Sequence, residues 1–172
     1  NIKSEMEDLA MKLMDPAEYN EIEARLKQTV SSRNRLIKEF SQPVTEKLDT
    51  LGIKYDLKSR TKSIHSIWQK MRRQGVAFEE VYDIFAIRII IDADPAHEKS
   101  SCWQVYSVVT DLYQPDPSRM RDWISVPKTN GYESLHTTVV TPAGRWVEVQ
   151  IRTRRMDEIA EKGLAAHFKY KG

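Results

Sequence analysis

The spacing of apolar residues predicts that the first third of the chain is helical. Apolar residues in 6–14 recur at helical intervals, and a second stripe follows them. The tract 15–18, Asp-Pro-Ala-Glu, has the composition of a helix start with a capping box. Pro43 predicts a break or a restart, and Gly52 stands where a helix would end. The second stripe consists of Ile22, Leu26, Val30, Leu36, Ile37 and Phe40.

After residue 52 the pattern changes to short strands that alternate with helices. The tract 84–91 is too short and too rich in β-branched residues for a helix, and it predicts a central strand. Residues 135–140 and 147–152 alternate around the turn 141–144, which predicts a hairpin. The long connection 113–131 is typical of a functional or mobile loop. The other expected elements are a strand at 53–57, a helix at 62–74 that Gly75 closes, a helix opened by Asp94-Pro95, and a terminal helix at 155–167.

This order of elements predicts an α+β fold, in which a mixed β-sheet is packed with helices and preceded by a helical segment. We expect residues 1–52 to form a helical linker or extension and residues 53–172 to form the domain that carries the function. The sequence shows no internal repeat and no low-complexity tract. Its 172 residues are enough for one domain with a full-sized core.

The composition excludes several classes of protein. The single cysteine, Cys102, excludes a disulfide framework and a cysteine-based zinc site, and it fits a reducing cytoplasm. No apolar run approaches the roughly 20 residues that span a bilayer, so we expect no membrane partner. The chain begins with Asn1 and not with Met, and we therefore expect it to be a piece of a longer protein.

The glycines exclude the common phosphate-binding loops. The chain has six glycines and no two are near neighbours, whereas a P-loop, a dinucleotide-binding turn and a kinase glycine-rich loop need them clustered. The four histidines form neither an HExxH motif nor a His-Asp pair, which removes the common metallo-hydrolase signatures. Any phosphate that this chain binds must therefore be held by side chains.

The net charge of +2 hides a separation of charge along the chain. Residues 54–73 are strongly basic, and residues 79–98 are mostly acidic. Adjacent blocks of opposite charge indicate a polyanionic ligand with a divalent metal nearby. Two solvated faces of opposite sign are the alternative interpretation.

Three groups of residues carry candidate chemistry, and the first is basic. Lys62, Ser66 and Lys70 are spaced four residues apart on the expected helix, and Arg60 precedes them. Such a row can grip a triphosphate, because Arg binds phosphate through two hydrogen bonds and Lys binds it as a point charge. The alternative is an exposed basic helix that contacts nothing or binds RNA without specificity.

The second group consists of Asp83 and Glu148. Asp83 enters the apolar strand, and Glu148 lies within the hairpin on the face opposite its apolar residues. A carboxylate within a strand is costly to bury unless it faces a cleft or binds a cation. Two carboxylates from neighbouring strands predict a Mg²⁺ site for phosphoryl transfer. Alternatively, Glu148 faces solvent on a half-exposed hairpin.

The third group lies in the tract 128–132, Lys-Thr-Asn-Gly-Tyr. The pair Asn130-Gly131 favours a tight turn that would present Tyr132 at the start of the hairpin. A Tyr beside Lys128 and Asn130 can stack on a base and bind its edge. The alternative is a turn followed by a core aromatic residue.

Four longer tracts are more specific as an ordered set than any one of them is alone. They are 60–71 (RTKSIHSIWQKM), 82–88 (YDIFAIR), 122–138 (DWISVPKTNGYESLHTT) and 148–153 (EVQIRT). In this order they closely resemble the synthetase domain of the RelA/SpoT family of (p)ppGpp synthetases. The resemblance continues through the tract 161–167 and into the opening residues, so it covers essentially the whole chain.

The resemblance implies a nucleotidyltransferase-like fold and a Mg²⁺-dependent reaction. The β,γ-pyrophosphate of ATP would pass to the 3′-hydroxyl of GDP or GTP, giving (p)ppGpp and AMP. By position in the motifs, Asp83 would bind Mg²⁺, and Glu148 would bind the metal or take the hydroxyl proton. The implied ATP-side residues are Arg60, Lys62, Ser66, Lys70, Arg119 and Arg121, and the implied guanine-nucleotide residues are Lys128, Asn130, Tyr132 and His136.

Three positions depart from the family pattern. Residues 119–122 read Arg-Met-Arg-Asp where bifunctional members have Arg-x-Lys-Asp, which leaves the choice between GDP and GTP open. Glu133 stands where Gln is usual, and His65 stands where Tyr is usual.

The resemblance also gives expectations for the parent protein. The chain lacks the His-Asp motif of the family's hydrolase domain, so we expect that this piece does not degrade the product. The resemblance implies that the hydrolase domain lies before residue 1 of the parent protein and regulatory domains after residue 172. Contacts with the ribosome or tRNA would come only through those other domains. The alternative to an enzyme is a catalytically silent regulatory module that binds guanine nucleotide or RNA, although a module that binds only RNA needs neither Asp83 nor Glu148.

Overall fold

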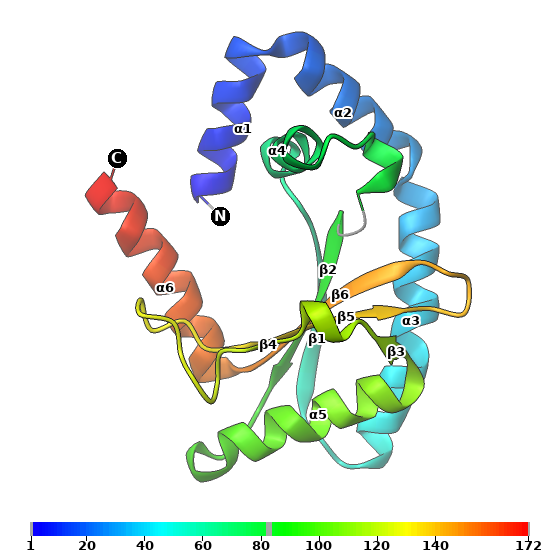
Figure 1. The fold of residues 1–172 in the computed structure, drawn as a ribbon. Coiled ribbons are helices and arrows are strands. Elements are labelled where there is room, and N and C mark those ends of the chain that lie inside the picture. The colour runs from blue at the N-terminus through cyan, green and yellow to red at the C-terminus, as the bar shows by residue number, and fades with distance from the viewer. Residues whose placement is uncertain (1, 82–83, 172) are drawn as a thin grey trace.

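The computed structural model describes residues 2–81 and 84–171, with side chains as far as residue 163 (Figure 1). The described helices are α1 (Ile2–Met14), α2 (Pro16–Gln28), α3 (Val30–Thr50), α4 (Ile64–Gln74), α5 (Glu98–Leu112) and α6 (Arg154–Lys171). The strands are β1 (Tyr55–Thr61), β2 (Phe85–Ile91), β3 (Gln114–Pro115), β4 (Arg121–Asp122), β5 (Leu135–Val140) and β6 (Trp146–Thr153). Short 3₁₀ turns cover Phe78–Glu80, Pro95–His97 and Pro117–Arg119.

The described strands form one mixed sheet with the order β1-β2-β6-β5-β3, and β4 also pairs with β5. The pair β2–β6 is parallel, and the other pairs are antiparallel. The parallel pair brings a strand from the middle of the sequence against the second strand of the hairpin. This arrangement confirms the predicted α+β fold with a mixed sheet and preceding helices.

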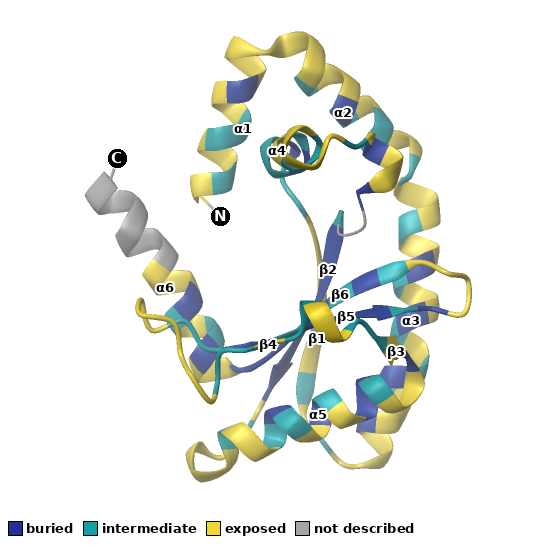
Figure 2. Cartoon of the chain, viewed as in Figure 1, coloured by how far each residue is buried: buried dark blue, intermediate teal, exposed yellow. Residues whose placement is uncertain are grey.

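The two faces of the sheet differ in character because successive side chains point to opposite faces. One face is apolar and packs against α3 and α5, which together with it enclose the main core. A second, smaller core lies between α1, α2 and α4. Figure 2 shows that buried residues concentrate in β2 and β5 and on the inner sides of α3 and α5. The other face of the sheet is therefore left for polar residues.

Helix α3 continues through Pro43, so the predicted break at that residue is wrong. Pro removes a backbone hydrogen bond from a helix interior. Here Leu36, Phe40, Val44 and Leu48 recur every four residues and are buried in the main core, and this packing offsets the loss. The division of the chain at residue 52 stays a prediction, although α3 shares its core with the sheet.

The helix ends are in part as expected. Gly52 and Gly75 follow α3 and α4 with φ of 71° and 63°, the left-handed conformation that glycine adopts at low cost. The capping box predicted at the start of α2 is wrong, because Asp15 makes no side-chain cap bond. The carboxylate of Glu18 instead accepts a hydrogen bond from the indole of Trp68 on α4.

The remaining differences are shifts of element boundaries. Strand β1 runs from Tyr55 to Thr61 and is longer than the predicted strand at 53–57. Helix α4 begins at Ile64 after the cap residue Ser63, so Lys62 precedes the helix. The long connection 113–131 adds β3 and β4 to the sheet. Within the described part of the chain, no helix is long and apolar enough to cross a membrane.

Candidate functional site

The polar face of the sheet collects side chains from four strands. Residues that pair across neighbouring strands share a face, so charged residues far apart in sequence come into rows. One row runs through Arg60, Ala86, Glu148 and Thr138. The next row runs through Lys58, Arg88, Gln150 and His136.

A cavity of about 220 Å³ opens on this face between the sheet and the start of α4. Three of the predicted ATP-side residues, Arg60, Lys62 and Ser66, line it, whereas Lys70 does not. Arg60 is supplied by β1, and the backbone N–H of Lys62 donates to the carbonyl of Ile84 at 2.6 Å, which ties the segment before α4 to β2. The full lining is Ser4, Arg60, Lys62, Ser63, Ser66, Ala86, Arg88 and Gln150.

The first turn of α4 borders this cavity. The hydroxyl of Ser63 accepts a hydrogen bond from the backbone N–H of Ser66 at 3.2 Å and donates one to the Ser66 hydroxyl at 2.8 Å. Helix N-termini attract anions because their first amide groups lack partners within the helix. In α4 the amides of the first turn already have side-chain partners, so Ser66 offers the cavity its hydroxyl and not a free helix end.

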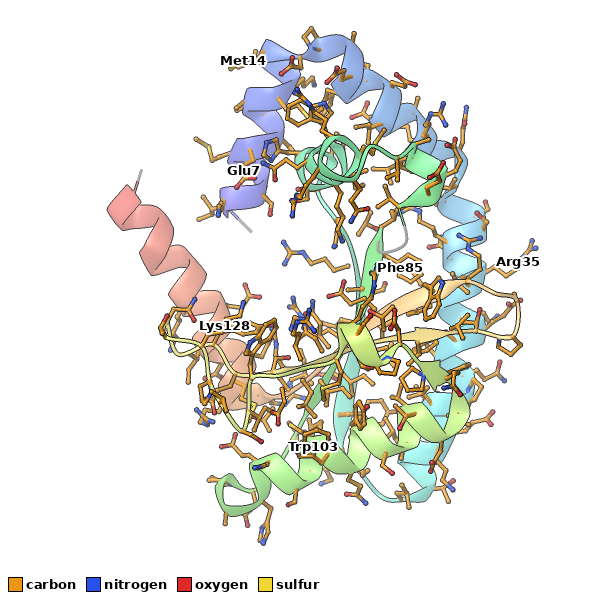
Figure 3. All side chains as sticks on the ribbon, in the orientation of Figure 1. Glu7, Met14, Arg35, Phe85, Trp103 and Lys128 are labelled. Carbon is orange, nitrogen blue, oxygen red and sulfur yellow. The ribbon has the colours of Figure 1, made fainter. Side chains whose placement is uncertain are left out.

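Two acidic residues of α1 hold this same helix end. The backbone amides of His65 and Ile64 donate to the carboxylate of Asp8, at 2.9 and 3.3 Å. Glu7 lies on the side of α1 turned towards α4 (Figure 3), and its carboxylate is 2.7 Å from Nδ1 of His65. Helix α1 thus fixes the position of the helix that carries Ser66.

Glu148 lies between the basic cavity and the second half of the site. Its carboxylate is 3.8 Å from Nζ of Lys62 and 3.7 Å from Nδ1 of His136, and it accepts a hydrogen bond from the Gln150 amide at 3.2 Å. Its side chain is largely buried against these groups. Glu148 therefore faces the site and not bulk solvent, so the solvent-facing alternative is wrong.

The other predicted metal ligand, Asp83, lies outside the described residues. No group of three or more His, Cys, Asp or Glu side chains that could hold a metal ion occurs among the residues that are described. Glu148 fits Mg²⁺ as a single ligand, because it offers a hard carboxylate oxygen on the polar face. A complete metal site would need oxygen ligands besides those of Glu148.

Aromatic rings form the second half of the site. The rings of Trp123, Tyr132 and His136 meet edge to face, with centroids 4.8 to 5.8 Å apart. Nζ of Lys128 lies 4.0 Å from the centroid of the Trp123 ring and 5.5 Å from that of Tyr132. Lys128, Tyr132 and His136 are thus brought together as predicted.

The turn before β5 has the geometry that its sequence predicts. The side-chain oxygen of Asn130 accepts a hydrogen bond from the backbone N–H of Tyr132 at 3.0 Å. The backbone N–H of Gly131 donates to the carbonyl of Lys128 at 2.8 Å, and Gly131 has a φ of 85°. Asn130 therefore shapes the turn that presents Tyr132.

His136 is held in the neutral form. Burial and the neighbouring cations, with Arg152 and Lys128 foremost, lower the pKa of His136 from 6.5 to about 3. A neutral imidazole can accept a hydrogen bond at one ring nitrogen and donate one at the other. His136 can therefore bridge two polar neighbours.

Arg119 and Arg121 lie near the site but do not line the cavity. Arg119 pairs with Asp116 at 3.7 Å. Arg121 pairs in register with His136 on β5, and its guanidinium donates to the carbonyls of Ser118 and Met120. The structure thus places both arginines on the segment that flanks the aromatic half.

Sequence reasoning missed Arg88 and Arg152. Arg88 interrupts the buried strand β2, and Arg152 is a buried charge on β6. A charge within a strand is the signal that singled out Glu148. The pKa of Arg88 is lowered chiefly by burial, and its Nε is buried without a hydrogen-bond partner among the described groups. Nη1 of Arg88 contacts Glu161 at 3.4 Å and Asp157 at 3.6 Å, so Arg88 adds to the cavity a cation with one unsatisfied N–H group.

Comparisons with known proteins give a consistent result. Residues 59–172 match the family model described as "Region found in RelA / SpoT proteins". The chain is 39% identical over 170 residues to a GTP pyrophosphokinase of Myxococcus xanthus, covering 99% of this chain and 22% of that protein. It is 40% identical over 172 residues to a guanosine-3′,5′-bis(diphosphate) 3′-pyrophosphohydrolase of Aquifex aeolicus, covering 99% of this chain and 24% of that protein. The chain thus spans about a quarter of the length of these curated relatives.

The fold also has relatives among solved structures. Small alarmone synthetase 2 of Bacillus subtilis matches with a TM-score of 0.58 and 27% identity, over 81% of both chains. Small alarmone synthetase 1 of the same organism, solved with its product pppGpp, matches with a TM-score of 0.54 and 23% identity over 83% of this chain and 84% of that one. The second likeness is one of fold. Together they confirm the nucleotidyltransferase-like architecture.

Proposed function

The chain belongs to the RelA/SpoT family, and on that premise we propose that it transfers the β,γ-pyrophosphate of ATP to the 3′-hydroxyl of GDP or GTP. The 3′-oxygen forms a bond to the β-phosphorus of ATP, and the bond from that phosphorus to the oxygen of the α-phosphate breaks. AMP leaves, and the guanine nucleotide becomes (p)ppGpp. The hydroxyl proton passes to a base.

One observation carries this proposal. The carboxylate of Glu148 lies 3.8 Å from Lys62 of the basic cavity and 3.7 Å from His136 of the aromatic half. A reaction that joins two nucleotides needs a binding place for each and a polar group between them. Glu148 occupies that intermediate position.

The basic cavity serves the ATP side in this proposal. Arg60, Lys62 and Ser66 line it together with Arg88, so cations meet the triphosphate where negative charge moves during transfer. Lys70 would act from farther along α4, and Arg119 and Arg121 would act from the segment beside the aromatic half. These last three roles rest on the family motifs.

The aromatic half serves the guanine nucleotide. Tyr132 would stack on the base, and Lys128 would bind phosphate from its position over Trp123 and Tyr132. Asn130 would act chiefly by shaping the turn, because its side-chain oxygen is engaged by the Tyr132 amide. His136 would contact the nucleotide from the neighbouring strand position.

Mg²⁺ is the cofactor that we propose, with Asp83 and Glu148 as its protein ligands. When bound, it would neutralise phosphate charge and hold the pyrophosphoryl group in position. Glu148 would also accept the 3′-hydroxyl proton. A carboxylate cannot ligate a metal strongly and act as a free base through the same oxygen, so its two oxygens would divide these tasks.

The proposed substrates also indicate the cellular compartment. We propose that the protein acts in the cytoplasm, where ATP and GTP are abundant. Any contact with a ribosome or tRNA would be made by other parts of the longer relatives.

The test is incubation of the chain with ATP labelled at the γ-position, GDP or GTP, and Mg²⁺, followed by separation of the products. We expect labelled (p)ppGpp and an equal amount of AMP. Glu148→Gln and Asp83→Asn are each expected to lower turnover by at least about 100-fold. The exposed Asp111→Asn on α5 is the matched control and should retain turnover. Saturable guanine-nucleotide binding without any transfer would instead support the catalytically silent regulatory module.

A further inference from the structure

Arg152 is a buried charge on β6, with 2% of its side chain exposed. A buried guanidinium is stable only when its N–H groups are paired. Its Nε and Nη2 both donate to one carboxylate oxygen of Asp157 on α6, at 2.9 and 2.6 Å. Asp157 therefore fixes the plane and the direction of the Arg152 fork.

The remaining arm of that fork reaches the aromatic half of the site. Nη1 of Arg152 donates to the hydroxyl of Tyr132 at 3.0 Å, and the guanidinium carbon lies 5.7 Å from the centroid of the Tyr132 ring. These two residues are 20 positions apart in sequence and lie on different elements. Arg152 thus holds the far end of the ring that the turn presents.

The Tyr132 hydroxyl has a second partner, which sets the direction of its proton. It lies 2.8 Å from Nε2 of His136. An arginine can only donate, so the hydroxyl accepts from Arg152. The carboxylate of Glu148 beside Nδ1 favours the tautomer with its proton on Nδ1, and Nε2 then accepts the proton of the Tyr132 hydroxyl. The proton of the neutral imidazole then sits on Nδ1, which faces the carboxylate of Glu148 at 3.7 Å.

We propose that Arg152, held by Asp157, is a positioning residue that orients Tyr132 for the guanine nucleotide through the tyrosine hydroxyl. This inference rests on the proposed function, and it adds a residue that touches no substrate. The hydroxyl is anchored from two sides, so the ring face is fixed before the nucleotide arrives. Less conformational entropy is then lost when the nucleotide binds, and this raises the affinity for GDP and GTP.

The expected effect is selective. Arg152→Gln and Tyr132→Phe should each raise the KM for GDP and GTP by about tenfold, the usual size for a lost hydrogen bond to a charged group. The KM for ATP should change by less than about twofold in Tyr132→Phe, because that change leaves Arg88 of the basic cavity and its contact with Asp157 in place. Arg152→Lys keeps the charge and loses the fork, so it should restore only part of the affinity.

A double-mutant cycle separates positioning from general damage. If Arg152 acts through the hydroxyl, the double variant Arg152→Gln/Tyr132→Phe binds GDP no more weakly than either single variant, as measured by calorimetry without ATP. Effects that add would overturn the inference. Arg154→Gln is the matched control, because Arg154 stands two residues away and pairs with Asp56 and Asp92 instead.

A spectroscopic readout does not depend on catalysis. The ¹⁵N chemical shifts of His136 in the nucleotide-free protein should show a protonated Nδ1 and an Nε2 that accepts a hydrogen bond, and Tyr132→Phe should move the Nε2 shift towards that of a nitrogen without a hydrogen bond. A Tyr132→Phe spectrum like that of the wild type would overturn the inference even if Arg152→Gln failed to fold. If the double-mutant cycle of GDP binding gives the expected result but the wild type forms no product, only the proposed function is contradicted. Absence of GDP binding in the wild type would overturn both.

Discussion

Nζ of Lys62 lies 3.8 Å from the carboxylate of Glu148, although the two residues are far apart in the sequence. Strand pairing causes this meeting. Lys62 follows β1, which pairs with β2, and β2 pairs in turn with β6, which carries Glu148. The contact joins the basic cavity to the acid of the proposed active site.

The first prediction compares two lysines of the basic group. Lys62 lines the cavity and contacts Glu148, whereas Lys70 lies outside the cavity lining. Lys62→Met is therefore expected to lower kcat/KM for ATP by about 100-fold, and Lys70→Met by about tenfold or less. Steady-state rates with ATP varied at saturating GDP measure both. A larger loss for Lys70→Met would mean that the ATP side extends along α4 and is not confined to this cavity.

The second prediction concerns Arg88, whose charge is partly desolvated in the cavity. Its Nε has no hydrogen-bond partner among the described groups, and it faces Asp157 at 3.6 Å. Arg88→Met should weaken ATP binding by about tenfold through the loss of a phosphate partner. The same change should alter the free energy of unfolding by less than about 1 kcal/mol, because neither acidic partner of Arg88 is left buried and unpaired: Asp157 keeps its hydrogen bonds to Arg152, and Glu161 is exposed.

Calorimetric titration with a non-hydrolysable ATP analogue and urea unfolding measure the two effects of Arg88→Met. Arg72→Met is the control, since Arg72 stacks on Trp68 with 4.8 Å to the ring centroid and lies outside the cavity. Equal losses of ATP affinity in both variants would show that general positive charge, and not the position of Arg88, attracts the nucleotide.

Much of the fold could be predicted because its signals are local. The tract that forms β2 and the hairpin of β5 and β6 have clear apolar patterns, and each element is determined by residues that are close together in the sequence. The course of α3 through Pro43 could not be predicted in this way. It depends on packing of Leu36 to Leu48 against a sheet that forms from later residues, and tertiary burial overrides the local preference of proline.

The residues of the candidate site also differ in whether the sequence alone could predict them. Glu148 was found because a charge in an apolar strand is costly, and the same argument applies to Arg88 and Arg152. By contrast, nothing local marks Asp8 as the partner of the His65 amide, because the two are 57 positions apart. Contacts between distant segments depend on the assembled fold, and sequence spacing does not encode them.

The third prediction tests the contact between α1 and α4. Asp8 accepts hydrogen bonds from two amides at the start of α4, whereas Asp15 caps α2 without a side-chain bond. Asp8→Ala should lower the free energy of unfolding by about 1 kcal/mol, the usual value for a lost helix cap. Asp15→Ala, the matched control, should change it by less than about 0.5 kcal/mol.

The same contact should affect the ATP side. Loss of the Asp8 carboxylate frees the end of α4 that carries Ser66, so the KM for ATP is expected to rise while the KM for GDP stays constant. Urea unfolding and steady-state kinetics provide the two measurements. If Asp8→Ala and Asp15→Ala are equally stable and equally active, the α1 contact contributes nothing to the position of α4.

The fourth prediction follows from the lowered pKa of His136. Its pKa is about 3 in the folded protein against 6.5 for an unperturbed histidine, with burial as the largest cause. Above pH 6.5 the imidazole is neutral in both folded and unfolded chains and adds nothing to the pH dependence. Between pH 6.5 and about 3 the unfolded chain binds a proton that the folded protein excludes, so acidification favours unfolding through this residue.

The variant His136→Asn removes that proton-binding group and isolates its effect. The free energy of unfolding of the wild type, relative to that of His136→Asn, should be about 2 kcal/mol lower at pH 5 than at pH 7.5, so the wild type is the more destabilised by acid. Urea unfolding at both pH values, without Mg²⁺ or nucleotide, gives the comparison. A difference between the two proteins that stays constant with pH would mean that folded His136 takes up a proton as readily as the unfolded chain does, and the cations around it would then be too well screened to hold it neutral.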